Sequence, residues 1–184
     1  MAVYKLVPHG DDLRLPVVIT VEAARTLEGC FLIHFQVAGH VGHINLPEPH
    51  RYPVRQDELW RRTCFEAFVG VAGSSIYTEF NFAPSTAWAA YRFDGYRAGM
   101  ISPTELNVLP NVQHTDDILD LWATVDISDD AVLCLSGEWQ MGLSAVIEER
   151  DGTKSYWALA HAPGPPDFHN RNCWIARLPA PDPS

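Results

Sequence analysis

The sequence has no long hydrophobic run and few basic residues. No stretch approaches the roughly 18 consecutive apolar residues of a membrane-spanning helix, so we expect no membrane segment. Lys and Arg together number 13 against 23 Asp and Glu, which gives a formal net charge of -10. Because an acidic surface repels phosphate backbones, we expect no nucleic-acid partner.

Cysteine and cofactor motifs are also scarce. The four cysteines are Cys30, Cys64, Cys134 and Cys173, and no C-x-x-C pair suggests a zinc ribbon. Two disulfides stay open, but the pattern favours free buried thiols in a reducing compartment. No glycine-rich phosphate loop or G-x-S-x-G elbow occurs, so we expect no cofactor or metal. The first ten residues contain no apolar run, so we expect no signal peptide and a bacterial, cytoplasmic protein.

What the sequence does contain is a globular composition rich in tryptophan. The 184 residues are 47% hydrophobic and 20% charged, which excludes a disordered or collagen-like chain. A chain of this length fits one domain with a substantial core. Aromatic residues make up 11%, including six Trp, and such side chains either pack or recognise a ligand.

Apolar and polar residues alternate along most of the chain, whereas helical spacing is hard to find. Alternation with a period of two is typical of strands that bury one face. It runs through residues 17–23, 31–37, 119–125 and 143–147, and Asp151-Gly152 supplies a tight hairpin turn. We predict an all-β fold, a two-layered antiparallel β-sandwich with about nine strands.

The chain is predicted to form a single domain over residues 1–178, with its sandwich strands in residues 17–178. Residues 179–184 are a proline-rich tail that cannot join the centre of a sheet. Minor helical turns are expected near residues 56–62 and 94–100. Residues 46–60 form a long, proline-rich connection, and loops of that length in compact domains are often functional.

Two glutamates are expected on the outer side of one hairpin. The apolar residues of the strands near 64–69 and 76–81 predict their inward faces, which leaves Glu66, Glu79 and Asn81 outside. The simplest hairpin register places Glu66 directly opposite Glu79. Facing carboxylates repel, so a cation, the hydroxyls of a ligand or an arginine should offset the pair. The arginines nearby in sequence are Arg61, Arg62, Arg92 and Arg97. The alternative is an ordinary solvated or salt-bridged face.

A proline-stiffened loop at residues 163–169 carries a second cluster: Asp167, Phe168 and His169. A rigid loop loses little ordering entropy when a ligand binds, which suits a recognition site. We predict that this loop lies against residues 59–66 and forms one pocket with them. The alternative is a structural rim loop in which Phe168 caps the core.

Several segments resemble a known family. Residues 60–68 (W-R-R-T-C-F-E-A-F), 79–85 (E-F-N-F-A-P-S) and 88–97 (W-A-A-Y-R-F-D-G-Y-R) look like bacterial DOMON-like domain proteins. The P-D-F-H element at residues 166–169 is similar to the C-terminal end of the family-9 carbohydrate-binding modules. With the N-terminal strands, these segments cover nearly the whole chain. The resemblance implies a β-sandwich with a ligand site at one end or on a concave face, in a superfamily that binds either sugars or haem.

The resemblance also implies roles for individual residues. In the sugar-binding relatives a Trp precedes a Glu by six residues, and Trp60 and Glu66 keep that spacing. Trp60 would then stack on a terminal sugar while Glu66 accepts hydrogen bonds from hydroxyls. Phe168 or His169 would form the second wall of this aromatic clamp. Glu79 departs from the pattern, because these relatives carry a basic residue there.

We therefore predict a non-catalytic module that binds a small molecule, a carbohydrate or related polar compound. The predicted ligand-binding residues are Trp60, Glu66, Glu79, Asn81, Arg92, Asp167, Phe168 and His169. One open alternative is a haem-binding redox domain that uses Met100 with His161 or His169 as axial ligands. Another is a small hydrolase or isomerase in which Glu66 and Glu79 act as acid and base.

Overall fold

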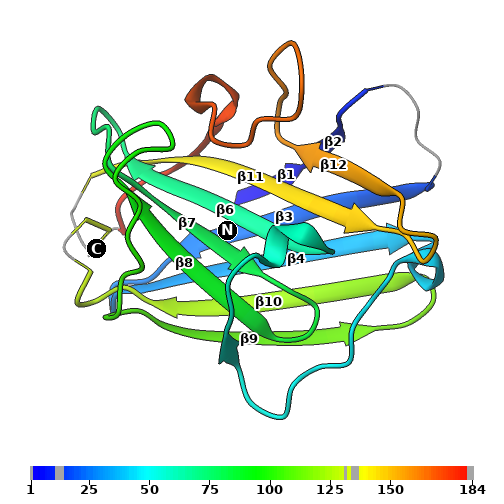
Figure 1. Ribbon diagram of the computed structural model, residues 1–184. Coiled ribbons are helices and arrows are strands. Elements are labelled where there is room, and N and C mark those ends of the chain that lie inside the picture. Colours follow the sequence, from blue (N-terminus) through cyan, green and yellow to red (C-terminus); the bar gives the residue numbers. More distant parts are fainter. Residues whose placement is uncertain (1, 11–14, 131, 134–136, 182–184) are drawn as a thin grey trace.

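The chain folds into two stacked β-sheets in a computed structural model that describes residues 2–10, 15–130, 132–133 and 137–181 (Figure 1). The only helices in these ranges are three short 3-10 turns: η1 (Val41–His43), η2 (Leu59–Arg61) and η3 (Arg171–Cys173). None of the described segments is a helix long and apolar enough to cross a membrane. The predicted two-layered, all-β sandwich is confirmed.

The first sheet has five strands, each antiparallel to its neighbours. Their order across the sheet is β1 (Ala2–Lys5), β3 (Val17–Arg25), β4 (Cys30–Gly39), β10 (Ile118–Asp126) and β9 (Asn107–His114).

The second sheet has eight strands and carries the site described below. Seven lie in the order β2 (Val7–Pro8), β12 (Lys154–Ala158), β11 (Trp139–Glu148), β6 (Cys64–Val71), β7 (Tyr77–Phe82), β8 (Ala87–Phe93) and β5 (Val54–Arg55). The eighth, β13 (Ala176–Leu178), pairs with one end of β11. All pairings are antiparallel except that of β5 with β8.

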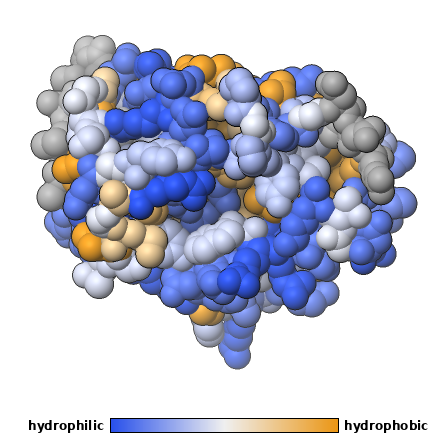
Figure 2. All heavy atoms as spheres, turned by 45° about the horizontal axis from the view of Figure 1, so that its top comes forward, coloured by the Kyte–Doolittle hydropathy of each residue, from blue (hydrophilic) through white to orange (hydrophobic). Residues whose placement is uncertain are grey.

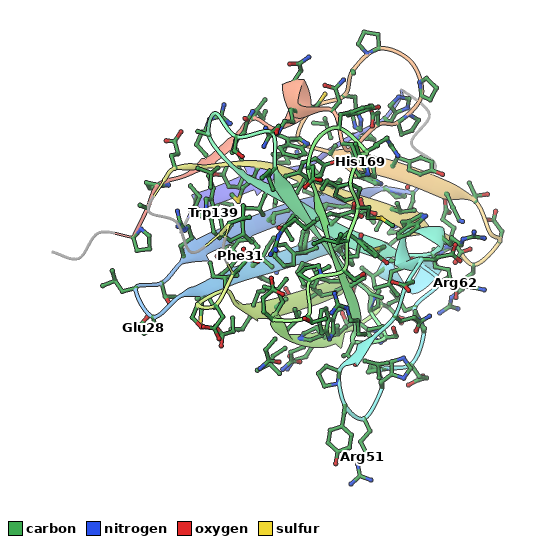
Figure 3. The ribbon with its side chains drawn as sticks, turned by 60° about the vertical axis from the view of Figure 1, so that its left-hand side comes forward. Glu28, Phe31, Arg51, Arg62, Trp139 and His169 are labelled. Carbon is green, nitrogen blue, oxygen red and sulfur yellow. The ribbon has the colours of Figure 1, made fainter. Side chains whose placement is uncertain are left out.

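The alternation in the sequence decides which side chains lie between the sheets. Ile19, Phe35 and Leu121 belong to the predicted inward set, and all three are fully buried. Figure 3 places Phe31 and Trp139 between the layers, and their rings meet edge to face at 5.3 Å. This apolar layer holds the two sheets together.

The second sheet is also buried on its outer face. A separate cluster of apolar side chains gathers there, in which aromatic residues from β6, β7 and β8 and Trp174 pack with smaller side chains. The segments that cover this face are η2, the turn at residues 94–100 and the loop at residues 163–174. Because loops cover the outer face, a recessed site can form there, on the opposite side of the sheet from the core between the two sheets.

Some local predictions are wrong. Residues 94–100 form a tight reversal instead of a helical turn, with the Asp94 amide donating to the Ala98 carbonyl at 3.0 Å. The sandwich also begins before residue 17, because β1 and β2 already pair with β3 and β12. The helical turn expected near residues 56–62 is η2.

The long connection at residues 46–60 contains β5 and the first two residues of η2, and Figure 3 shows its tip projecting from the body at Arg51. Cys30, Cys64 and Cys173 are free thiols, and Cys134 lies outside the described residues. Residues 179–181 continue past β13 without joining a strand, and residues 182–184 of the predicted tail lie outside the described ranges.

Candidate ligand-binding site

The covered outer face of the second sheet contains a pocket of about 510 Å³. Figure 2 shows the loop-bearing face, which is hollowed between hydrophilic rims with hydrophobic atoms visible inside the hollow. The segment 59–66 contributes Trp60 and Glu66, and the loop at residues 163–169 contributes Pro166, Phe168 and His169. The two segments thus line one pocket, as the sequence predicted.

Strand alternation places the floor of the pocket. The side chains that point outward are Glu66 and Phe68 from β6, Glu79 from β7, and Tyr91 and Phe93 from β8. The residues between them point into the sandwich core. The same backbone therefore carries core side chains on one face and pocket side chains on the other.

The predicted pairing of Glu66 with Glu79 is wrong by one repeat of the pleat. Glu66 lies opposite Asn81, and Glu79 lies opposite Phe68. The glutamates therefore share the outer face but sit diagonally. A shift of two residues leaves every side chain on the same face, so the alternation alone could not distinguish these registers.

Both glutamates are buried within the pocket floor. Their residues are 3% and 5% exposed for Glu66 and Glu79 respectively, which excludes the alternative of a solvated face. The Ser144 hydroxyl donates to Glu66 Oε2 at 3.2 Å, and Asn81 Nδ2 donates to Glu79 Oε1 at 2.7 Å. Among the described residues, neither carboxylate forms an ion pair with a lysine or arginine.

This burial changes the acidity of the pair. Desolvation, with repulsion from Glu79 added, raises the pKa of Glu66 well above its ordinary value. Desolvation also raises the pKa of Glu79 to about 7, although its hydrogen bond from Asn81 and the charge of Arg97 oppose the shift. Because burial disfavours both ionised forms, the pair holds more protons near neutral pH than two exposed glutamates would.

His169 lies beside the carboxylates as a neutral ring. Desolvation and the charge of Arg97 lower the pKa of His169 to about 4. Its Nδ1 is 2.7 Å from the Tyr77 hydroxyl, and its Nε2 is 3.6 Å from Glu79 Oε2. Phe68 and Phe93 meet the ring edge to face at 5.0 and 5.2 Å. Figure 3 shows His169 above the sheet, under the C-terminal loop.

The loop that carries Phe168 and His169 is fixed by Trp174. Its indole Nε1 donates to the Phe168 carbonyl at 2.8 Å, and the ring lies directly over Gly142 of β11. A β-carbon at Gly142 would come within 2.3 Å of the indole, so only glycine permits this approach. The absence of a side chain at Gly142 therefore lets Trp174 hold the loop close against the sheet.

The opposite rim is held by a charged cluster. Arg97 reaches across from the turn and places Nη2 3.0 Å from Asp167 Oδ1, while the Tyr96 hydroxyl donates to Asp167 Oδ2 at 2.8 Å. These bonds, with the charge of Arg97, lower the pKa of Asp167 despite its partial burial. Asp167 thus ties the 94–100 turn to the C-terminal loop.

The two aromatic residues predicted for the clamp both line the pocket. Trp60, on η2, is 41% exposed and meets Tyr91 edge to face at 5.9 Å. Phe168 lies 6.3 Å from Tyr156, measured between ring centroids. The Tyr91 hydroxyl donates to Asp57 at 2.7 Å, which fixes its ring beneath Trp60 in the same aromatic group.

Three of the predicted ligand-binding residues do not line the pocket: Asn81, Asp167 and Arg92. Asn81 is fully buried and orients Glu79, and Asp167 ties the rim together, as described above. The structure does not bring Arg92 to the pocket. Its side chain points to the other face of β8, with Nη2 at 2.5 Å from Asp130 and 2.9 Å from Glu105.

Several lining residues were not among the predicted ligand-binding residues: Phe68, Tyr91, Phe93, Val146, Tyr156 and Pro166. Arg97 and Met100 also line the pocket; Arg97 was considered only as a partner for the glutamates, and Met100 only as a haem ligand. Extending the alternation along β6 and β8 would have found Phe68, Tyr91 and Phe93, because they share the outer face with the glutamates. Tyr156 comes from β12, whose position beside β11 required the sheet order.

Solved structures with the same architecture are known. A proposed carbohydrate-binding protein from Bacteroides uniformis ATCC 8492 aligns with a TM-score of 0.64 and 13% identity, covering 96% of this chain and 85% of that one. A carbohydrate binding module family 9 (CBM9) from Caldicellulosiruptor kristjanssonii, in complex with glucose, aligns at 0.55 and 7%, covering 91% and 78%. The chain has a CBM9-like fold.

A cellotriose complex of a CBM9 module from the same organism also has this fold, with a TM-score of 0.56 and 9% identity over 99% of this chain and 84% of that one. No protein-family model matches the sequence, and no curated protein is significantly similar to it. At such low identities, the CBM9-like similarity is one of fold, and the site must be argued from its own residues.

Proposed function

We propose that this protein binds a carbohydrate in the pocket on the outer face of its second sheet, without catalysing a reaction. The observation that carries the proposal is that Trp60 and Phe168 line the same cavity as two buried carboxylates. CBM9 modules with this fold were solved in complex with glucose and with cellotriose, which supports a carbohydrate ligand for this protein.

The chemistry of the lining fits a sugar ring. Faces of Trp60, Tyr91 and Phe168 offer apolar area against which the C–H groups of a pyranose can stack. Glu66 and Glu79 can accept hydrogen bonds from hydroxyls, or donate one while protonated. A cavity of about 510 Å³ falls within the ordinary range for small-molecule sites.

The haem alternative does not fit the residues present. Met100 and His169 both line the pocket, but Nδ1 of His169 is bonded to Tyr77 and its Nε2 faces Glu79. An axial ligand needs a free imidazole nitrogen directed into the haem cavity. His161 does not line the pocket, and its Nε2 lies 2.9 Å from the Val7 carbonyl.

A hydrolase or isomerase stays a second candidate because of one observation, the pair of buried glutamates with raised pKa values. Carboxyl groups that retain protons near neutral pH can act as general acids. Incubation of oligosaccharides with the protein, followed by chromatography, distinguishes the two. We expect unchanged sugars, whereas products that disappear in Glu66→Gln would establish catalysis instead.

The binding proposal is tested by a saccharide screen on the intact protein and on Trp60→Ala. We expect the substitution to weaken binding of the best ligand by about 1–3 kcal/mol, roughly 5- to 150-fold, because a stacking surface is lost. Trp122→Ala is the matched control, since Trp122 is 36% exposed on the other sheet and does not line the pocket. Equal binding by wild type and Trp60→Ala would place the site elsewhere.

A further inference from the structure

We propose that the saccharide recognised by this pocket carries a free protonated amine, and that Glu66 and Glu79 bind that ammonium group. The inference rests on the proposed function, because it specifies the sugar class that the same pocket accepts. It follows from the charges inside the pocket and from the kind of surface that surrounds them.

The pocket holds more acidic side chains than cations that could pair with them. Arg97 is the one arginine or lysine among the described lining residues, and its guanidinium is already paired with Asp167 at 3.0 Å. His169 contributes no positive charge, because its buried ring is neutral. Glu66 and Glu79 are therefore the acidic groups that no side-chain cation in the described chain neutralises.

The hydrogen bonds leave the pair with capacity for a donor. Glu66 accepts from Ser144 and Glu79 from Asn81, each through one oxygen. A carboxylate has about four lone-pair sites, so these two neutral donors satisfy only part of the pair. An ammonium group brings three N–H donors and a positive charge, and charge-assisted hydrogen bonds are roughly twice as strong as neutral ones.

The surrounding surface also favours a cation. Aromatic rings make up much of the lining, among them Trp60, Phe68, Tyr91, Phe93 and Phe168. The negative faces of such rings attract ammonium groups, and this attraction grows when water is excluded. An aromatic enclosure with carboxylates at its floor combines both forms of ammonium recognition. A neutral sugar can use the rings for stacking, but it brings no positive charge that would stabilise the ionised carboxylates.

Protonation of Glu66 and Glu79 when no ligand is bound explains how the two carboxyl groups tolerate their burial. The titratable and charged groups that interact with the pair are Cys64, Tyr77, Tyr91, Arg97 and His169. An entering ammonium group favours the ionised carboxylates, so its binding releases protons near pH 7. Below that pH the pair must first be deprotonated, and affinity for an amino sugar rises as the pH increases from about 5 to 7.

Isothermal titration calorimetry with three probes tests the inference: D-glucosamine, D-glucose and N-acetyl-D-glucosamine. Acetylation keeps the nitrogen substituent but removes its charge, which makes the third probe a matched control. We expect D-glucosamine to bind at least about tenfold more tightly than the neutral sugars at pH 7. Its observed enthalpy should depend on the ionisation enthalpy of the buffer, because protons are released, and that of D-glucose should not.

The outcomes separate the two proposals. If D-glucose or N-acetyl-D-glucosamine binds as tightly as D-glucosamine, the inference is overturned while the carbohydrate proposal stands. If none of the probes binds, and D-galactosamine and D-galactose also fail, the amine inference is wrong. Failure of the whole saccharide screen overturns the carbohydrate proposal as well.

A variant assigns the effect to the carboxylates. Glu79→Gln keeps the shape and the acceptor oxygen but removes the charge, so we expect the preference for D-glucosamine over D-glucose to fall about tenfold or more. Glu22→Gln, on β3 of the other sheet and outside the pocket lining, is the control for loss of one negative charge. A preference retained in both Glu79→Gln and Glu66→Gln contradicts the assigned role.

Discussion

At the scale of single residues, the buried glutamates bind protons more tightly in the folded protein than in the unfolded chain. Because the pKa of Glu79 rises from 4.5 to about 7, its contribution to stability is full below about pH 4.5 and declines as the pH rises toward 7. The raised pKa of Glu66 likewise gives a contribution to stability that declines as the pH rises. His169 acts oppositely, since its pKa is lowered to about 4 and its contribution is lost as the pH falls through that value.

Glu79→Gln should therefore stabilise the fold in a way that depends on pH. Removing the ionisable group avoids the cost of a buried charge, which is on the order of 2–3 kcal/mol at pH 8 and much smaller at pH 5. Urea unfolding at the two pH values measures the difference between the variant and the wild type. Glu22→Gln should show no comparable gain at pH 8. An equal effect of Glu79→Gln at both pH values would contradict the raised pKa.

At the scale of elements, β11 positions the loop that carries Phe168 and His169, because Trp174 packs directly on this strand. Gly142→Ala would place a β-carbon within 2.3 Å of the Trp174 ring, and the indole would have to move. We expect this to destabilise the protein by about 1–3 kcal/mol and to weaken sugar binding, because Trp174 also holds the Phe168 carbonyl. Thermal unfolding and ligand titration measure the two effects.

Gly95→Ala is the matched control for this prediction. Gly95 lies in the 94–100 turn, and a β-carbon there meets no atom within 4 Å. The control should unfold at nearly the same temperature as the wild type and should bind normally. If Gly142→Ala behaves in the same way, the close packing of Trp174 on β11 does not position the loop.

Strand alternation illustrates how much of the fold could be predicted from the sequence. Alternation in residues 17–23 and 31–37 correctly identified β3, β4 and their buried faces, because a strand with one face in the core needs that pattern. It could not fix the register of β6 and β7, since both candidate pairings satisfy the same pattern. Arg92 was misplaced for a related reason: its nearness to Glu79 in sequence concealed that it points through the opposite face.

At the scale of the whole molecule, Arg92 and Asp130 connect the two sheets. Arg92 belongs to β8 of the second sheet, and Asp130 follows β10 of the first. Asp130 is 1% exposed, and its Oδ1 also accepts hydrogen bonds from the amides of Val132 and Leu133, both at 2.8 Å. Removing one partner of such a buried pair leaves the other charge without compensation.

Asp130→Ala should accordingly lower stability by about 3–5 kcal/mol. For a chain of this length, that corresponds to a fall in melting temperature of roughly 6–20 °C. Asp129→Ala, its exposed neighbour, should stay within a degree or two of the wild type. Differential scanning calorimetry measures both, and similar melting temperatures for the two variants would show that the connection contributes little.

The use of both faces of one sheet has a consequence for how this protein can evolve. In β6, β7 and β8, neighbouring positions serve different selective demands, since odd and even residues face different environments. Outward positions such as Tyr91 and Phe93 line the pocket, so substitutions there change its lining and the outer aromatic cluster but not the packing between the two sheets. Selection for the proposed ligand would therefore act on one set of positions in these strands, and selection for packing between the sheets on the alternating set.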